Sequence, residues 1–237
     1  MKNHLFCIGL VCVLTLAGCS KHDESSAGAG SPDMDAQAMS DVKTANESVA
    51  KPDFTAAARD LKYQQAVKEA AALLGAEPQP LEGADGPIVG GFSFDVPQPK
   101  IEAILFKAHT NFLAKGFYLF RYDQMFGIHG QPDKVGLLPT ANKYDVMAAL
   151  EVNGAKYSLH TAGIIEWMKK LEQEQPYVLT GIGTDYMEGY FTTPVEDPRG
   201  LARRMYKFCP DIVDQGGGTV DKLVNELLKG KLYFWWD

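Results

Sequence analysis

Cys209 is the residue whose type and surroundings come closest to those of a catalytic group. It stands in the run Phe208-Cys209-Pro210-Asp211, with a carboxylate nearby and a glycine-rich stretch after it, which is a setting in which a thiol nucleophile could work. Pro210 ends the preceding helix, and the partial negative charge at a helix C-terminus raises a thiol pKa and makes the thiolate scarcer. We therefore interpret Cys209 as a buried packing residue and keep a catalytic role as the alternative. Asp211 and Asp214 fit turn and capping hydrogen bonds better than a catalytic carboxylate pair.

Histidines give a second, weaker indication of chemistry. His109, His129 and His160 stand far apart, and none belongs to a His-x-x-x-His or His-Glu-x-x-His pair, so no zinc site is predicted. His129 lies in a loop of glycine and proline, which is the one histidine setting here that is typical of functional sites. A polar loop residue is the simpler interpretation of His129, and a catalytic histidine is the alternative.

A glycine-rich segment, Gln215-Gly216-Gly217-Gly218-Thr219, comes directly before a predicted helix. Such a loop can present backbone N–H groups to an anion. The segment lacks the Gly-Lys-Ser/Thr ending of a phosphate-binding P-loop and the strand that precedes one. The pattern indicates instead that Thr219 caps the helix and that Asp221 lies in its first turn. No cofactor is predicted.

Aromatic residues near the end of the chain suggest a surface for a partner. In a strand over residues 232–236, Trp236 shares one face with Leu232 and Phe234, while Trp235 shares the other face with Tyr233. One face must belong to the core. Tyr233 and Trp235 are then candidates for a partner-binding surface, because exposed Trp and Tyr are enriched in protein interfaces. This surface would disappear if helices covered the sheet on both sides.

The first nineteen residues give the clearest indication of where the protein is located in the cell. Lys2 and His4 precede an apolar run over residues 5–16, which ends in Leu16-Ala17-Gly18-Cys19. This pattern resembles a bacterial lipoprotein signal. The resemblance implies that residues 1–18 are a signal peptide, that the Cys19 thiol takes a diacylglyceryl group, and that acyl chains such as palmitate anchor the protein in a membrane. Ser20 after the cysteine is similar to the default for the outer membrane, facing the periplasm.

Charge excludes several classes of partner. The chain has a net charge of −7, and it becomes one unit more negative when Lys2 leaves with the signal peptide. No cluster of Lys and Arg forms the cationic face that nucleic-acid binding needs. The acidic balance also disfavours electrostatic binding to anionic lipid, which leaves the lipid on Cys19 as the membrane attachment. After lipidation Cys209 is the one free thiol, so no intramolecular disulfide is expected.

Composition changes near residue 52 and predicts a tether followed by a single domain. Residues 19–52 are rich in Ser, Ala, Gly and Asp and have no sustained apolar period, which is typical of a disordered linker. The rest, residues 53–237, can bury a substantial core, because the chain is 46% hydrophobic and 11% aromatic. We predict an α+β fold, with helices packed on one face of a mostly antiparallel sheet.

Periodicity and capping residues place the elements of this domain. The predicted helices cover residues 53–75, 100–115, 142–153, 161–171, 197–208 and 220–228. The predicted strands cover residues 88–96 and 117–122, a hairpin over 176–191, and 232–236, while the proline-punctuated segment 77–87 is interpreted as a connector.

The run over residues 208–216, together with Trp235-Trp236-Asp237, resembles the C-terminal signature of a widespread bacterial family of uncharacterised domains. The resemblance covers roughly Tyr144 to Asp237 well and residues 92–138 loosely. It implies a shared fold and carries no established activity.

Three hypotheses for function follow. The first is a tethered, non-catalytic protein-binding module in the envelope, for instance an immunity or inhibitor lipoprotein that neutralises an incoming toxin or enzyme. The second is a hydrolase-like envelope enzyme that uses Cys209 or His129 with a carboxylate. The third is a structural envelope lipoprotein.

Overall fold

A computed structural model describes residues 49–123 and 130–237. The predicted signal peptide with Cys19, most of the predicted tether and His129 lie outside the described residues. Within the part that is described, no helix is both long and apolar enough to cross a membrane.

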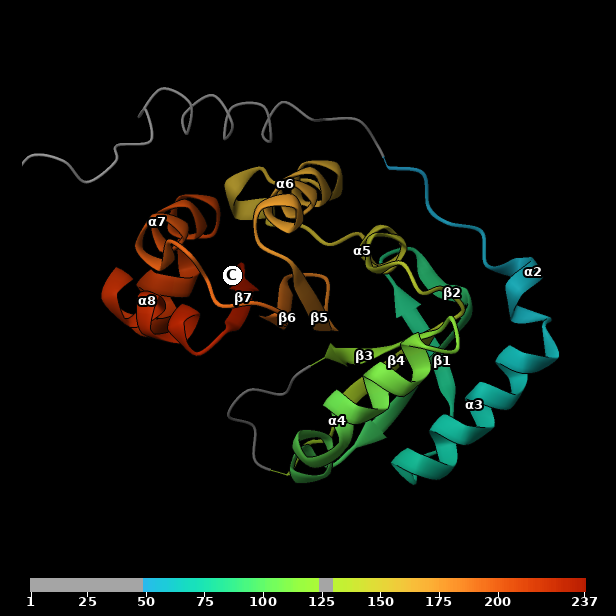
Figure 1. Cartoon of the computed structure of the whole chain (residues 1–237). Helices are drawn as coiled ribbons and strands as arrows, with labels where there is room; N and C mark the ends of the chain where they lie inside the picture. The colour runs from blue at the N-terminus through green and yellow to red at the C-terminus, as the bar shows by residue number, and fades with distance from the viewer. Residues whose placement is uncertain (1–48, 124–129) are drawn as a thin grey trace, which may run out of the picture.

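A seven-stranded sheet forms the centre of the fold, with strand order β1-β2-β4-β3-β5-β6-β7 (Figure 1). Every neighbouring pair is antiparallel except β3 and β5, which run parallel. The mostly antiparallel α+β fold expected from the sequence is therefore confirmed. The strands are β1 (Gln79–Gly83), β2 (Gly86–Val96), β3 (Tyr118–Asp123), β4 (Asp133–Leu138), β5 (Tyr177–Ile182), β6 (Tyr186–Phe191) and β7 (Lys231–Trp235).

Helices cover the two faces of the sheet over different strands (Figure 1). Two of them pack in a smaller core on one face of β2, β3 and β4, while the others pack in a larger core on the opposite face, chiefly over β5, β6 and β7. The expectation that one face alone is covered is wrong, because the helix over residues 98–113 is apolar toward the other face. The helices are α2 (Thr55–Ala58), α3 (Leu61–Leu74), α4 (Gln98–Leu113), α5 (Lys143–Leu150), α6 (Thr161–Glu174), α7 (Pro198–Phe208) and α8 (Val220–Leu228).

The first predicted helix is interrupted. It ends at Gly75 as expected, where φ is +62°. However, Asp60 adopts an extended conformation, and its side chain accepts a hydrogen bond from the Lys62 N–H. Asp60 is therefore the N-cap of α3, and α2 is a separate short helix before it, because an Asp side chain competes for backbone N–H groups that helix continuation would use.

The predicted connector at residues 77–87 is also wrong, because this segment forms β1, the turn and the start of β2. Pro80 lies in β1, which is an edge strand, where a missing N–H is tolerated. Strand β4 was not predicted either. All four residues of β4 that follow Lys134 are buried, whichever face they point to, so the strand shows no alternation of apolar and polar side chains.

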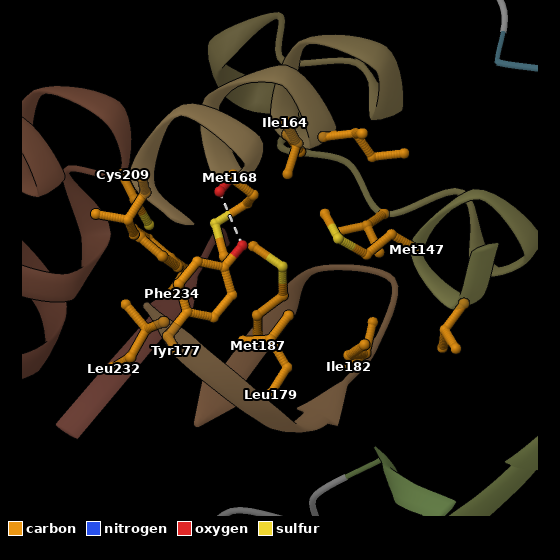
Figure 2. Packing of buried hydrophobic residues seen from close by; sticks show 14 of the residues in the cluster. Met147, Ile164, Met168, Tyr177, Leu179, Ile182, Met187, Cys209, Leu232 and Phe234 are labelled. Carbon is orange, nitrogen blue, oxygen red and sulfur yellow. Dashed lines mark hydrogen bonds between the residues drawn. The ribbon is translucent and has the colours of Figure 1, made fainter. Parts of the chain in front are cut away.

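The helices and strands of the C-terminal half pack on one another in the larger core. Figure 2 shows the larger core, in which side chains of α5 and α6 meet those of β5, β6 and β7. Trp167 of α6 stacks on Phe208 of α7, with ring centroids 4.3 Å apart. Phe208 in turn meets the edges of Phe234 and Trp236, so the terminal strand is held by an aromatic cluster. The aromatic strand at the end of the chain is thus part of the core on one face.

Candidate binding groove

A groove opens between α4 and the face of β5, β6 and β7 that the larger core does not occupy. Its volume is about 810 Å³. It exists because α4 packs on β3 and stops short of the sheet edge, while α6, α7 and α8 cover the other face. One end of the groove is aromatic and the other end is charged. This volume is in the range of ligand-binding sites in proteins.

The aromatic end lies on β7. Leu232, Phe234 and Trp236 are almost fully buried in the larger core, with 1%, 1% and 3% of their surface exposed. Tyr233 and Trp235 point to the other face, are only partly buried and line the groove. The division of the two faces predicted from the sequence is therefore the one observed, and the face of Tyr233 and Trp235 is not covered by a helix layer of its own.

The side chain of Phe106 continues this aromatic surface onto α4. It is 60% exposed and lines the groove. Its ring centroid lies 5.0 Å from that of Tyr190 on β6, so the helix and the sheet touch through these two rings. An exposed aromatic ring that packs on a second ring forms an apolar patch of the kind found in protein interfaces.

Arg121 on β3 is the centre of the charged end. Its guanidinium contacts Glu102 of α4 (Nη2 to Oε1, 2.5 Å) and Glu188 of β6 (Nη1 to Oε1, 3.0 Å), and its Nε lies 3.5 Å from Oδ2 of Asp133. Arg121 and Asp133 are nearly buried, with side-chain exposures of 4% and 1%, whereas the Glu102 side chain is 64% exposed at the groove mouth. One guanidinium therefore faces three carboxylates.

Gly181 of β5 makes this contact possible. A Cβ at position 181 would lie 2.4 Å from Cγ of Glu188, closer than two carbon atoms can approach. Gly181 is paired with Arg121 on one side and with Glu188 on the other. The absent side chain gives Glu188 the space to cross β5 toward the guanidinium.

Burial and charge act in opposite directions on these groups. Burial raises the pKa of Glu188, and the attraction of Arg121 offsets this in part, while Glu102 and Asp133 raise it further. Burial alone would lower the pKa of Arg121, but the carboxylates of Glu188 and Glu102 outweigh it and the pKa rises. Arg121 remains cationic, and the ion pair compensates the burial of Glu188 incompletely.

Cys209 lies outside the groove and inside the larger core (Figure 2). It is fully buried at the C-cap of α7, and its thiol donates to the Trp235 carbonyl at 2.9 Å. Burial, and not the helix end considered above, is the main cause that raises its pKa, to about 12. These surroundings are those of a structural thiol.

The acceptor of that thiol lies on the outer edge of the sheet. Phe191 N donates to Gly230 O and Trp236 N donates to Asp185 O. Hydrogen-bonded and non-bonded residue pairs alternate along an antiparallel ladder, so the pair of Trp235 with Tyr186 is a non-bonded one. The backbone N–H and C=O groups of Trp235 therefore point away from β6. The Cys209 thiol therefore caps one carbonyl of the free edge of β7, which would otherwise be open to pairing with another chain.

Asp211 fixes the end of the chain in the same way. Its side chain is nearly buried and accepts hydrogen bonds from the Tyr157 hydroxyl at 2.6 Å, from Gln215 Nε2 at 3.0 Å and from the Asp237 backbone N–H at 2.9 Å. Burial would raise the pKa of Asp211, but these hydrogen bonds, with Lys156 nearby, lower it. Asp211 thus joins distant segments, a larger role than the predicted local turn.

The remaining candidate residues have structural roles. Asp214 accepts a hydrogen bond from the Tyr206 hydroxyl at 2.9 Å. Thr219 is the N-cap of α8, as predicted, and the glycine-rich segment before it is part of a π-helix over Ile212–Gly217. His109 is buried, with Nδ1 2.7 Å from the Leu119 carbonyl, and His160 is the residue before α6.

No metal centre is found in residues 49–123 and 130–237, since no three His, Cys, Asp or Glu side chains there are grouped to hold an ion. Sequence reasoning identified Tyr233 and Trp235 but missed Arg121, Glu102 and Glu188. One signal was present, because Arg121 is a basic residue between two aromatic residues, Phe120 and Tyr122, of the strand Tyr118–Asp123. An arginine in such a position needs buried carboxylate partners.

Comparison with known proteins concerns the C-terminal part of the chain. Searches of curated proteins and of solved structures found no match. A family described as Domain of unknown function (DUF4253) matches residues 134–237, which begin in β4 and include β5, β6 and β7. The match therefore contains Glu188, Tyr233 and Trp235 but not Glu102 or Arg121. The C-terminal part of the chain, residues 134–237, is thus similar to a family of domains of unknown function, as the resemblance noted in the sequence indicated.

Proposed function

We propose that the protein is a membrane-anchored lipoprotein whose folded part is a non-catalytic protein-binding domain, and that the groove between α4 and β7 is its binding surface. The observation that carries the proposal is the groove itself, in which the exposed ring of Phe106 and the half-buried rings of Tyr233 and Trp235 lie in the same groove as partly exposed charges. Interfaces combine these two features, because aromatic anchors supply affinity and charges at the rim supply specificity.

The arrangement of the charged groups supports binding over catalysis. Glu102, Glu188 and Asp133 are all engaged with Arg121, so none is held as a base next to a nucleophile. Cys209, the candidate nucleophile, does not line the groove, and burial raises its thiol pKa to about 12. A thiol of this kind is almost wholly protonated at neutral pH.

Anchoring through Cys19 completes the proposal. A lipidated cysteine followed by about thirty flexible residues would give the domain a root-mean-square reach of roughly 30 Å from the membrane. This reach suits a domain that meets a partner in the periplasm. An immunity or inhibitor protein that binds an incoming toxin or enzyme is the form of this function that we favour.

The test is affinity capture from envelope extracts with the full chain and its variants. Phe106→Ala and Trp235→Ala remove rings from the groove, whereas Leu228→Ala removes a side chain that is 65% exposed on α8 and does not line the groove. We expect a partner that the original chain and Leu228→Ala retain and that both groove variants lose while keeping their melting temperatures. A partner retained by all four chains would refute the assignment of the groove.

A further inference from the structure

We propose that the groove binds an extended segment of a partner protein in which a basic side chain stands two residues from a large apolar one. This inference rests on the proposed binding function and specifies its ligand. The basic side chain would lie at the charged end, between Glu102 and Glu188, and the apolar side chain would lie over Tyr233 and Trp235. Both ends belong to the same groove.

Charge at the first end is unbalanced. Glu102 and Glu188 both pair with the single guanidinium of Arg121, so these two carboxylates exceed the one cation that they share among the described side chains. Glu102 is 64% exposed and Glu188 is 27% exposed, which leaves both within reach of a ligand in the groove. A second cation placed there would compensate the excess negative charge. It would also favour the ionised form of Glu188, whose pKa is raised chiefly by burial.

The second end is aromatic and carries no excess of negative charge. Glu226 pairs with Lys231 at 2.8 Å and with Lys229 at 2.6 Å. Tyr233 lies opposite Glu188 of β6, and Trp235 lies two residues further along β7. A large aliphatic or aromatic side chain would lose water-exposed surface here, and rings in such a position are frequent energetic centres of interfaces.

The distance between the two ends sets the spacing in the ligand. Glu188 of β6, at the charged end, is paired with Tyr233 of β7. Neighbouring strands lie about 4.8 Å apart, and alternate side chains of an extended chain lie about 6.6 Å apart and point to the same side. Two ligand side chains that are two residues apart therefore fit the two ends.

The long-range field favours the same partner. The whole chain has a net charge of −7, which attracts basic proteins and repels acidic ones during encounter. A metal ion does not fit this cluster, because Arg121 occupies the point at which the three carboxylates meet. The complementary charge is therefore that of an ammonium or guanidinium group on a side chain.

Selection from a random peptide library on the full chain tests the inference. The peptides are linear, about eight residues long and displayed with capped ends, so the two side chains can occupy several positions. Sequencing of the retained peptides reports their charge and spacing, and fluorescence anisotropy of selected peptides gives their dissociation constants. The variants are Trp235→Ala, Glu102→Gln and, as the matched control, Glu174→Gln. The control removes a half-exposed carboxylate that pairs with Arg204 away from the groove.

We expect enrichment of peptides with one Lys or Arg two residues from a large apolar residue. Trp235→Ala should weaken their binding about thirtyfold, Glu102→Gln about two- to fivefold, and Glu174→Gln not at all. Raising the salt concentration should weaken binding to the original chain more than to Glu102→Gln.

Two other results have distinct meanings. Enriched peptides that lack a basic residue, but whose binding still depends on Trp235, would overturn the inferred ligand and leave the groove as a binding surface. Retention of no peptide, or retention that neither groove variant alters, would overturn both the inferred ligand and the proposed function.

Discussion

Chemical labelling of Cys209 measures how deeply the core protects this thiol. Its pKa is raised to about 12, compared with about 8.5 for a free cysteine. Each unit of pKa reduces the thiolate tenfold at a fixed neutral pH, so the native thiolate is about three thousandfold scarcer than in the unfolded chain. Because the side chain is also fully buried, labelling should proceed only through opening of the domain.

The assay follows alkylation of the peptide that contains Cys209 by mass spectrometry, so the other three cysteines of the chain do not interfere. We expect native labelling to be at least about a thousandfold slower than labelling in denaturant. A native rate within about tenfold of the denatured rate would refute the structural assignment and return the enzyme hypothesis to first place.

Stability at alkaline pH gives an independent measure of the same thiol. A folded pKa above the unfolded value means that the stabilising contribution is complete below about pH 8.5 and is lost as pH rises toward about 12. Cys209→Ala removes this pH dependence. It also removes the donor to the Trp235 carbonyl, which should cost about 1–3 kcal/mol near neutral pH. Urea unfolding at several pH values should show a shallower alkaline loss for the variant, and parallel curves would contradict the pKa argument.

Three further predictions concern the ends of the chain. Deletion of residues 232–237 should unfold the domain, because each of its buried large side chains contributes roughly 1.5–3 kcal/mol against a total of about 5–15 kcal/mol, and an unchanged melting temperature would refute this. Cys19→Ala should abolish fatty-acid labelling and partition into detergent, and undiminished label would contradict the predicted lipidation. Limited proteolysis should remove residues 20–48 and stop before Lys51, whose ammonium pairs with Asp85 and Glu151, whereas an uncut N-terminal segment would show that it packs on the domain.

Local signals determined the elements that the sequence predicted well. Asn142 and Thr219 were identified as N-caps, and each accepts a hydrogen bond from a backbone N–H in the first turn of its helix. Gly75 was identified as a helix end and has the positive φ that glycine tolerates. Such residues act within a few positions of themselves, so their effect can be read without knowledge of the fold.

The elements that were missed depend on tertiary neighbours. Pro80 is acceptable in β1 only because β1 is at the edge of the sheet, and the buried strand β4 shows no alternation because helices cover it on both sides. The charged cluster is the clearest case. Arg121, Glu102 and Glu188 come from β3, α4 and β6, and they meet only because the parallel pairing of β3 with β5 brings β6 within reach of Arg121.

The residues of the C-terminal signature, 208–216 and 235–237, show why the match to the family does not identify a ligand. Cys209 and Asp211, from the first part of the signature, bind the backbone of Trp235 and Asp237, from the second part. The signature therefore describes how the terminal strand is held in the sheet. In contrast, Arg121 lies before residue 134, where the family match begins, and Tyr233 reaches the groove on the face opposite the core. The match therefore does not include all of the charged end of the groove, so the identity of the partner must come from experiments on the groove.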